Sequence, residues 1–180
     1  MAHKHTHDNI NWPARLSSLR RADELDARYD RQVADRLVDL LGADTKPVVV
    51  DVGSGGGGMS VAFAQALAAR GGGRVVLSDA VGELLDPATA LVQEAAAGTS
   101  VAVDAVRADA ADDQLADLLP PADLVWASRV VHHLPDQQAA IDRLARVLAP
   151  GGWLALSEAA SRCAACRGTS ASANPGSATG

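Results

Sequence analysis

The residues best suited to chemistry lie in a glycine-rich segment that follows a short valine-rich run. Val48–Val52 is followed directly by Gly53-Ser54-Gly55-Gly56-Gly57-Gly58. A strand that ends in a glycine turn before a helix lets a ligand approach the backbone, and the first N–H groups of the helix point outward. The segment also satisfies G-x-G-x-x-G, a pattern found in dinucleotide-binding enzymes. The glycines alone therefore predict a ligand site but leave the ligand open.

Asp51 narrows the choice of ligand. It stands two positions before Gly53, at the end of the predicted strand. A carboxylate aimed at this loop repels a pyrophosphate and favours a cationic ligand, either by direct contact or through water. S-adenosylmethionine has an ammonium group, a sulfonium group and no phosphate, so it is the cofactor that we predict. The alternative role for Asp51 is that of a helix-capping or turn carboxylate.

Two further aspartates follow the next two predicted strands. Asp79 ends the second strand, where a carboxylate can accept hydrogen bonds from both ribose hydroxyls, although NAD enzymes use the same device. Asp109 closes the third strand, within reach of an adenine amino group, and a surface turn is an equally good explanation for it alone. Because open α/β sheets bind ligands at the carboxyl edge of their strands, three acids at three successive strand ends predict one shared site.

These residues are positioned by short apolar runs that alternate with helix-length segments. The predicted strands are Val48–Val52, Arg74–Ser78, Val101–Val106, Leu124–Ala127 and Trp153–Ser157. The predicted helices between them are Met59–Arg70, Glu83–Ala97, Asp112–Leu119 and Asp136–Leu148, and Pro87 suggests that the second of these begins near Asp86. Such runs are typical of strands buried on both faces. The alternation predicts an α/β fold, a Rossmann-like, doubly wound, mostly parallel sheet in three α/β/α layers.

An amphipathic helix is predicted ahead of the first strand. Its apolar residues recur at four-residue spacing, at Leu25, Tyr29, Val33, Leu37 and Leu41. This helix either packs against the sheet or acts as a lid over the ligand. Residues 1–24, which include His3, His5 and His7, are predicted to be a flexible tail, with weak metal binding as the alternative. The predicted domain therefore covers residues 25–158.

Composition restricts the partners. The 180 residues allow one domain, and 48% hydrophobic with 21% charged residues is a globular composition. The net charge of −6, without a basic patch, disfavours nucleic acid as a partner. No apolar run approaches the roughly 20 residues that span a bilayer, and no hydrophobic segment follows the N-terminus. We therefore expect a cytoplasmic protein that binds neither nucleic acid nor membrane; the oligomeric state cannot be predicted.

The ordered set of motifs resembles class I S-adenosylmethionine-dependent methyltransferases, specifically the bacterial branch that acts on small molecules. The matching segments are Asp51–Gly57, Asp79, Asp109, Asp123–Asp136 and Leu148–Ser157. Family knowledge implies that the glycine loop contacts the methionine part, Asp79 the ribose and Asp109 the adenine. The cofactor residues that we predict are Asp51, Gly53, Ser54, Gly55, Gly57, Asp79, Ala80, Asp109, Ala110, Ser128 and Arg129; we predict no metal site.

The loop after the fourth predicted strand bears on the acceptor. Ser128-Arg129-Val130 stands where amino-methylating DNA enzymes have Asn/Asp-Pro-Pro-aromatic, and the two-glutamate loop of protein arginine methyltransferases is absent. A small-molecule acceptor is therefore predicted. Methyl transfer needs a general base only if the acceptor loses a proton, as a phenol or hydroxyl does. His133 is the candidate base; alternatively, His132 and His133 position the loop and wall the adenine pocket.

The composition changes after Glu158. Residues 159–180 have no apolar periodicity and resemble GC-rich DNA read out of frame. Cys163 and Cys166 have the spacing of a redox or half-zinc motif, but no second ligand pair accompanies them, so we interpret the spacing as accidental. We expect a one-base deletion near codon 159 and a disordered tail in place of the last strands of the family fold. The alternatives to an active methyltransferase are a non-catalytic cofactor-binding remnant and, less favoured because of Asp51, an NAD-dependent oxidoreductase.

Overall fold

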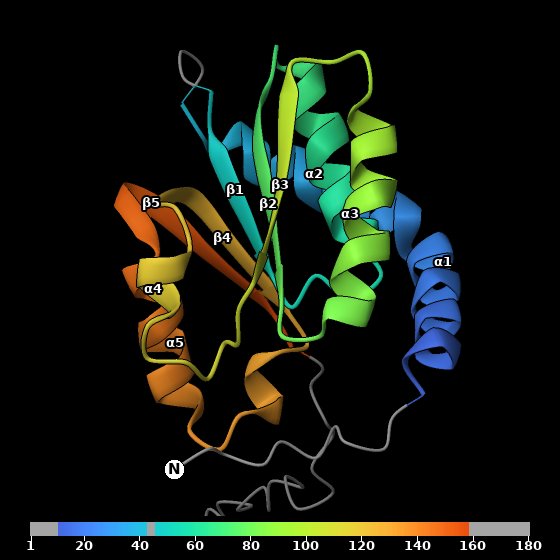
Figure 1. The fold of residues 1–180 in the computed structure, drawn as a ribbon. Helices are drawn as coiled ribbons and strands as arrows, with labels where there is room; N and C mark the ends of the chain where they lie inside the picture. Colours follow the sequence, from blue (N-terminus) through green and yellow to red (C-terminus); the bar gives the residue numbers. More distant parts are fainter. Residues whose placement is uncertain (1–10, 43–45, 159–180) are drawn as a thin grey trace, which may run out of the picture.

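Parallel strands form the centre of the structure (Figure 1). The computed structural model describes residues 11–42 and 46–158, and the sheet within them has five strands in the order β3-β2-β1-β4-β5. The strands are β1 (Val48–Val52), β2 (Gly73–Asp79), β3 (Val101–Arg107), β4 (Ala122–Ser128) and β5 (Leu148–Ser157). The predicted Rossmann-like parallel sheet is confirmed.

Helices cover both faces of the sheet. Helices α2 (Gly58–Ala69) and α3 (Gly82–Ala96) lie on one face, with α1 (Trp12–Asp39) packed outside α2. The short α4 (Leu115–Leu118) and α5 (Gln137–Arg146) lie on the other, and a 3-10 turn, η1 (Val131–His133), follows β4. This is the predicted three-layer arrangement. Among the residues that the structure describes, no helix is both long and apolar enough to cross a membrane.

Each face of the sheet builds its own apolar core, because successive side chains of a strand point to opposite faces. Val49 of β1 packs in the cluster with α2, whereas the adjacent Val50 packs in the cluster with α5. In the first cluster the ring of Phe63 meets Trp126 edge to face, with ring centroids 6.1 Å apart. Both valines are fully buried, so β1 is held firmly at the centre of the sheet. That rigidity positions the glycine loop at its end.

The two edge strands correct one prediction. We expected every strand to be buried on both faces, yet the residues of β3 and β5 are all partly buried or exposed. Each of these strands has a strand neighbour on one side only, β2 for β3 and β4 for β5. The open side of each edge strand therefore leaves its residues in partial contact with water.

Helix α1 begins earlier than predicted. It starts at Trp12, where the side chain of Asn11 accepts a hydrogen bond from the backbone N–H of Ala14 at 3.1 Å. The prediction of a flexible tail was therefore wrong for residues 12–24. Asn11 caps the helix, and the helical spacing of Trp12, Leu16 and Leu19 is followed by a mostly charged segment, residues 20–24, that separates it from the stripe beginning at Leu25. The predictions for His3, His5, His7, Cys163, Cys166 and the out-of-frame tail fall outside the described residues.

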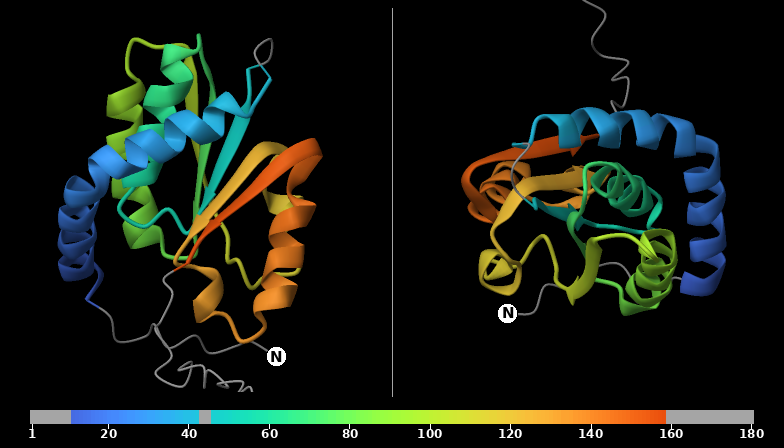
Figure 2. Two further views of the ribbon diagram at one scale, coloured as in Figure 1. Left: turned by 180° about the vertical axis from the view of Figure 1, so that it is seen from behind. Right: turned by 90° about the horizontal axis from the view of Figure 1, so that it is seen from above.

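The two halves of α1 have different surroundings. Figure 2 shows that the helix bends, so that its N-terminal half runs along another side of the domain. Val33, Leu37 and Leu41 of the predicted stripe pack against the core, whereas Leu25 and Tyr29 are 82% and 64% exposed. The C-terminal half therefore packs against the core, which is the first of the two roles considered for this helix. The N-terminal half instead places Leu19 and Asp23 against the glycine loop.

Two other helix predictions need correction. α3 begins at Gly82, so Pro87 lies inside the helix rather than in its first turn. The helix starts early because the chain turns at Asp79, whose Oδ1 accepts from the N–H of Val81 at 2.9 Å. α4 is confined to Leu115–Leu118, since the Asp112 side chain accepts from the N–H of Gln114 at 2.9 Å and forms a turn ahead of it.

Candidate functional site

The three predicted acids lie at the carboxyl edge of the sheet. Asp51 belongs to β1, Asp79 is the last residue of β2, and Asp109 lies two residues beyond β3. Asp51 and Asp79 are buried, with exposed fractions of 2% and 9%. The charges are close enough to interact, since Asp79 raises the pKa of Asp51 and Asp109 raises that of Asp79. The structure therefore brings together the acids that the sequence placed at three strand ends.

The glycine loop is pinned to the neighbouring strand. The backbone N–H groups of Gly53 and Ser54 both donate to the carbonyl of Ser78, at 2.7 and 3.1 Å. Gly53, Gly55 and Gly57 have φ values of 73°, 53° and 91°, in the left-handed region that favours glycine. A Cβ on Gly53 would lie 2.4 Å from Cγ2 of Val130, so the absence of a side chain lets the loop after β4 approach. The hydroxyl of Ser54 is buried in this loop and has no hydrogen-bond partner within residues 11–42 and 46–158.

Asp79 is held by the backbone around it. Its Oδ2 accepts from the N–H of Gly55 at 3.0 Å, and its Oδ1 from that of Val81. Burial raises the pKa of Asp79, while these hydrogen bonds oppose the shift. The following residue, Ala80, is exposed, and its carbonyl accepts from Nε of Arg107 at 3.2 Å. Each carboxylate oxygen accepts about two hydrogen bonds, so Asp79 retains capacity for a ligand hydroxyl.

Asp51 connects β1 to α2. Its Oδ2 accepts a hydrogen bond from the hydroxyl of Ser60 at 2.5 Å. Burial raises the pKa of Asp51 to about 7, the Ser60 hydrogen bond lowers it, and the charge of Asp79 raises it further. The carboxyl group is therefore poised to titrate near neutral pH. A cation placed nearby would stabilise its charged form.

The remaining predicted residues surround the same edge. Asp109 is partly buried, and its Oδ1 accepts from the N–H of Ala111 at 2.8 Å. This hydrogen bond forms a turn, which is the alternative explanation that the sequence offers for Asp109. Ala110 is buried. Ser128 ends β4 opposite Ser157 of β5.

The N-terminal half of α1 lies against the glycine loop. Oδ2 of Asp23 accepts from the N–H of Gly58 at 3.2 Å, at the first residue of α2, where the helix dipole favours a negative charge. A Cβ on Gly56 would lie 2.3 Å from that oxygen, and the position of a Cβ on Gly55 is 3.9 Å from Cδ1 of Leu19. Asp23 was not predicted as a site residue, because its contact with Gly58 depends on a helix that was not predicted at residues 12–24.

A cluster of charges connects α1 to the end of β4. Nη2 of Arg129 lies 3.5 Å from Oδ2 of Asp26. Arg129 has a φ of 57° and is the one non-glycine residue with positive φ among those described. Burial raises the pKa of Asp30 to about 6, helped by the charges of Asp26 and Asp23 and opposed by Arg129. Burial raises the pKa of Asp23 as well, and Arg129 and Arg20 both oppose that shift, so on this side of the loop three carboxylates (Asp23, Asp26 and Asp30) face two arginines.

The histidine pair lies in η1 and has a carboxylate partner that the sequence did not reveal. Oε1 of Glu158 accepts from the N–H groups of Val130 and Val131 at 3.2 and 2.9 Å, and its Oε2 contacts Nδ1 of His132. Partial burial acts to raise the pKa of Glu158, but the hydrogen bonds from His132 and the two backbone groups lower it overall. The rings of His132 and His133 lie with centroids 3.9 Å apart. The carboxylate thus contacts His132, not the predicted His133.

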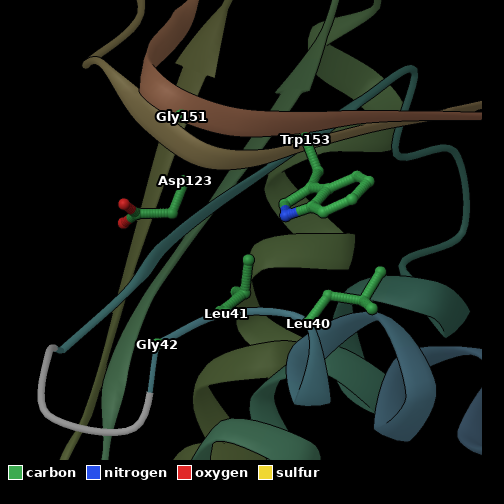
Figure 3. Close-up of a pocket in the computed structure, with 6 residues that line it drawn as sticks. All are labelled: Leu40, Leu41, Gly42, Asp123, Gly151 and Trp153. Atoms are coloured by element: carbon green, nitrogen blue, oxygen red, sulfur yellow. The ribbon is translucent and has the colours of Figure 1, made fainter.

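A separate cavity lies at the opposite end of the strands (Figure 3). It has a volume of about 80 Å³ and is lined by Leu40, Leu41, Gly42, Asp123, Gly151 and Trp153. Asp123 stands at the start of β4, and its Oδ2 accepts from the N–H of Val48 at 2.8 Å, which ties the starts of β4 and β1 together. Small-molecule sites usually enclose at least about 300 Å³. This cavity is therefore not the cofactor site.

A parallel sheet in this order, a glycine loop after β1 and acids at the ends of β1 and β2 define the Rossmann-like fold of class I S-adenosylmethionine-dependent methyltransferases. The chain belongs to the methyltransferase domain family, whose profile matches residues 50–156. The ubiquinone biosynthesis O-methyltransferase of Xylella fastidiosa strain M23 is 37% identical over 109 residues, which is 61% of this chain and 40% of that protein. The chain therefore spans less than half the length of the curated relatives it matches.

Solved structures of methyltransferases share the fold of this chain. Magnesium protoporphyrin IX methyltransferase from Synechocystis PCC 6803 with bound SAH is 29% identical, with a TM-score of 0.50, over 68% of this chain and 54% of that one. A SAM-dependent methyltransferase from Aquifex aeolicus shares the fold at 20% identity, with a TM-score of 0.59, over 78% of this chain and 71% of that one.

Proposed function

We propose that this chain binds S-adenosylmethionine at the carboxyl edge of its sheet and transfers the methyl group to a small molecule. The observation that carries the proposal is the concentration of carboxylates around the glycine loop, with Asp51 and Asp79 on the sheet side and Asp23 and Asp30 on α1. Such a field attracts a ligand with ammonium and sulfonium groups and repels a pyrophosphate. The net charge of −6 supports a small molecule rather than nucleic acid as the acceptor.

The residues of the loop fit the methionine part of this cofactor. The buried hydroxyl of Ser54 has no hydrogen-bond partner among the described residues, and a polar ligand group would satisfy it. Gly53 and Gly57 lack side chains where Val130 and Ala88 pack, whereas the nearest atoms to a Cβ on Gly55 would be 3.9 Å away, so a ligand can approach the backbone there. When bound, S-adenosylmethionine supplies an electrophilic methyl group. The part of the protein is to hold and orient both reactants, which provides most of the acceleration of such a displacement.

We assign the other predicted residues to the nucleoside part. Asp79 retains acceptor capacity for the ribose hydroxyls. Asp109, Ala110 and Ala80 are assigned to the adenine, and Ser128 and Arg129 to the cofactor side of the loop after β4. Asp51 acts through its charge and through Ser60, since its carboxylate is almost completely buried. We further propose that the functional domain extends from residue 12 to residue 158, because the N-terminal half of α1 contacts the loop.

Binding and turnover test the proposal in sequence. Calorimetry should show that S-adenosylhomocysteine binds the wild-type chain. A screen with radiolabelled methyl donor should then show transfer to a small acceptor. Binding without transfer to any acceptor would identify a cofactor-binding remnant instead. A chain that remains folded yet binds no S-adenosylhomocysteine would contradict the proposed function.

A further inference from the structure

We propose that His132 accepts the proton of a methyl-accepting hydroxyl group, and that Glu158 is the positioning residue that prepares His132 for this role. The inference rests on the proposed function and deepens it, because it assigns the acceptor to molecules with an ionisable hydroxyl. It also moves the role of base from His133 to its neighbour.

The contacts of Glu158 fix the orientation of its carboxylate. Oε1 accepts two backbone hydrogen bonds, from Val130 at 3.2 Å and from Val131 at 2.9 Å. Oε2 is thereby directed at Nδ1 of His132. These contacts join Glu158, which directly follows β5, to the turn after β4. Strands β4 and β5 are paired in the sheet, so their ends lie side by side. A carboxylate held at three points is a fixed part of the site rather than a mobile surface group.

This orientation determines which ring nitrogen of His132 is basic. An ionised carboxylate only accepts hydrogen bonds, so Nδ1 of His132 must carry the hydrogen. In the neutral ring Nε2 then holds the lone pair. The side chain of His132 is 37% exposed, which leaves the ring accessible to a ligand. Glu158 and the ring of His133 are the titratable groups that the described contacts place against it.

The histidine turn adjoins the proposed cofactor loop. Val130 immediately precedes η1, and its Cγ2 lies where a Cβ on Gly53 would come within 2.4 Å. His132 is two residues further along the same turn. A hydroxyl held beside this contact between the loop and the turn would therefore be close to both the methyl donor and the base.

In the proposed step, the acceptor oxygen forms a bond to the methyl carbon while the carbon–sulfur bond breaks, and the electron pair of that bond stays on sulfur. The hydroxyl proton passes to Nε2 of His132 and is later released to water. Glu158 stabilises the imidazolium while it exists, as a carboxylate does in the acid–base pairs of other enzymes.

Glu158→Gln is the decisive variant. Its Oε1 can still accept from Val130 and Val131, which leaves the amide NH₂ facing Nδ1 of His132. That NH₂ donates, so His132 should switch to the tautomer with hydrogen on Nε2 and lose its basic lone pair. We expect long-range ¹H–¹⁵N spectra of ¹⁵N-histidine-labelled protein to show hydrogen on Nδ1 in the wild type and on Nε2 in Glu158→Gln. His132→Asn identifies the resonances.

Methyl transfer gives the second readout. With catechol and 3,4-dihydroxybenzoate as hydroxyl probes, Glu158→Gln should lose at least about 100-fold in kcat while its affinity for S-adenosylhomocysteine stays within about twofold. Asp142→Asn, the same carboxylate-to-amide change at an exposed position of α5, should keep wild-type turnover. An unchanged tautomer or unchanged kcat in Glu158→Gln would overturn the inference. So would a wild-type chain that binds S-adenosylhomocysteine but methylates neither probe, whereas a failure to bind it would overturn the proposed function instead.

Discussion

Asp79 and Gly55 are joined by a hydrogen bond of 3.0 Å from the backbone N–H of the loop to Oδ2 of the carboxylate. A carboxylate from the end of β2 therefore already accepts from the glycine loop, at a position where a dinucleotide-binding loop would offer N–H groups to phosphate. Asp23 accepts from Gly58 in the same way at the start of α2. Because two N–H groups around the loop already donate to carboxylates, the site is suited to a cationic ligand.

Removing the charge of Asp79 should weaken cofactor binding. Asp79→Ala loses an acceptor for the ribose hydroxyls and also releases the N–H groups of Gly55 and Val81. Hydrogen bonds to charged groups contribute about 1.5–3 kcal/mol each, so calorimetry should show at least about a tenfold loss in S-adenosylhomocysteine affinity. Asp117→Ala, at an exposed position of α4, is the control and should bind as the wild type does. Equal affinities in the two variants would exclude Asp79 from the site.

Gly53→Ala should destabilise the fold. The new methyl group would lie 2.4 Å from Cγ2 of Val130, at a φ of 73° that disfavours side chains. Overpacking and left-handed backbone together cost about 2–4 kcal/mol, measurable as a lower urea midpoint. Adding Val130→Ala removes the clashing atom and should restore part of the loss. Gly42→Ala, where no atom of the described residues lies within 4 Å of the added Cβ, should remain near wild type; a similar loss there would contradict the steric explanation.

The buried Asp51 should make stability depend on pH. Its pKa in the folded state is about 7, above the ordinary value, so the folded chain binds more protons than the unfolded chain between about pH 4 and pH 7. Stability from this group is therefore greatest below about pH 4, falls as the pH rises from about 4 to 7, and is fully lost above that. Asp51→Asn keeps an acceptor for Ser60 and removes the buried charge, so it should be more stable than wild type at pH 8, by on the order of 4 kcal/mol.

Urea unfolding of wild type and Asp51→Asn at pH 5 and pH 8 tests the direction in which the free energy of unfolding changes with pH. The difference between the two proteins should be smaller at pH 5 than at pH 8, because only part of the stability from this group is lost by pH 5. If Asp51→Asn is instead the less stable protein at pH 8, the carboxylate is not desolvated as the structure indicates.

Cofactor binding should release protons. A sulfonium or ammonium group favours the ionised forms of Asp51 and Asp30, whose pKa values in the free chain are about 7 and about 6. Affinity for S-adenosylmethionine should therefore increase as the pH rises from 5.5 to 7.5. Titrations in buffers of different ionisation enthalpy measure the protons directly. Proton uptake, or an affinity independent of pH, would contradict the electrostatic role of these acids.

The sequence allowed a good prediction of the sheet and of one side of the site. Alternating apolar runs predict parallel strands, and the carboxyl ends of such strands meet at one edge, so Asp51 and Asp79 could be placed together. Asp23 and Glu158 could not be found this way. Their partners Gly58 and Val131 are 35 and 27 residues away along the chain, and such contacts depend on the bend of α1 and on the pairing of β4 with β5.

The boundaries that were missed have local causes. Asn11 caps a polar helical stretch whose inward residues, Leu19 and Asp23, do not form an apolar stripe. Pro87 predicts a helix start near Asp86, but the turn at Asp79 begins α3 earlier, so the helix includes a proline that lacks a backbone N–H. The half-burial of β3 follows from its place at the sheet edge, which depends on strand order rather than on its own residues.

The central claim is that the carboxylates around the glycine loop select S-adenosylmethionine over a dinucleotide. Calorimetric titration of one wild-type preparation with S-adenosylmethionine and with NAD at pH 7.5 tests it most directly. We predict saturable binding of S-adenosylmethionine, at least about 100-fold tighter than any binding of NAD, which corresponds to about 2.7 kcal/mol. Comparable binding of both ligands, or tighter binding of NAD, would contradict the claim.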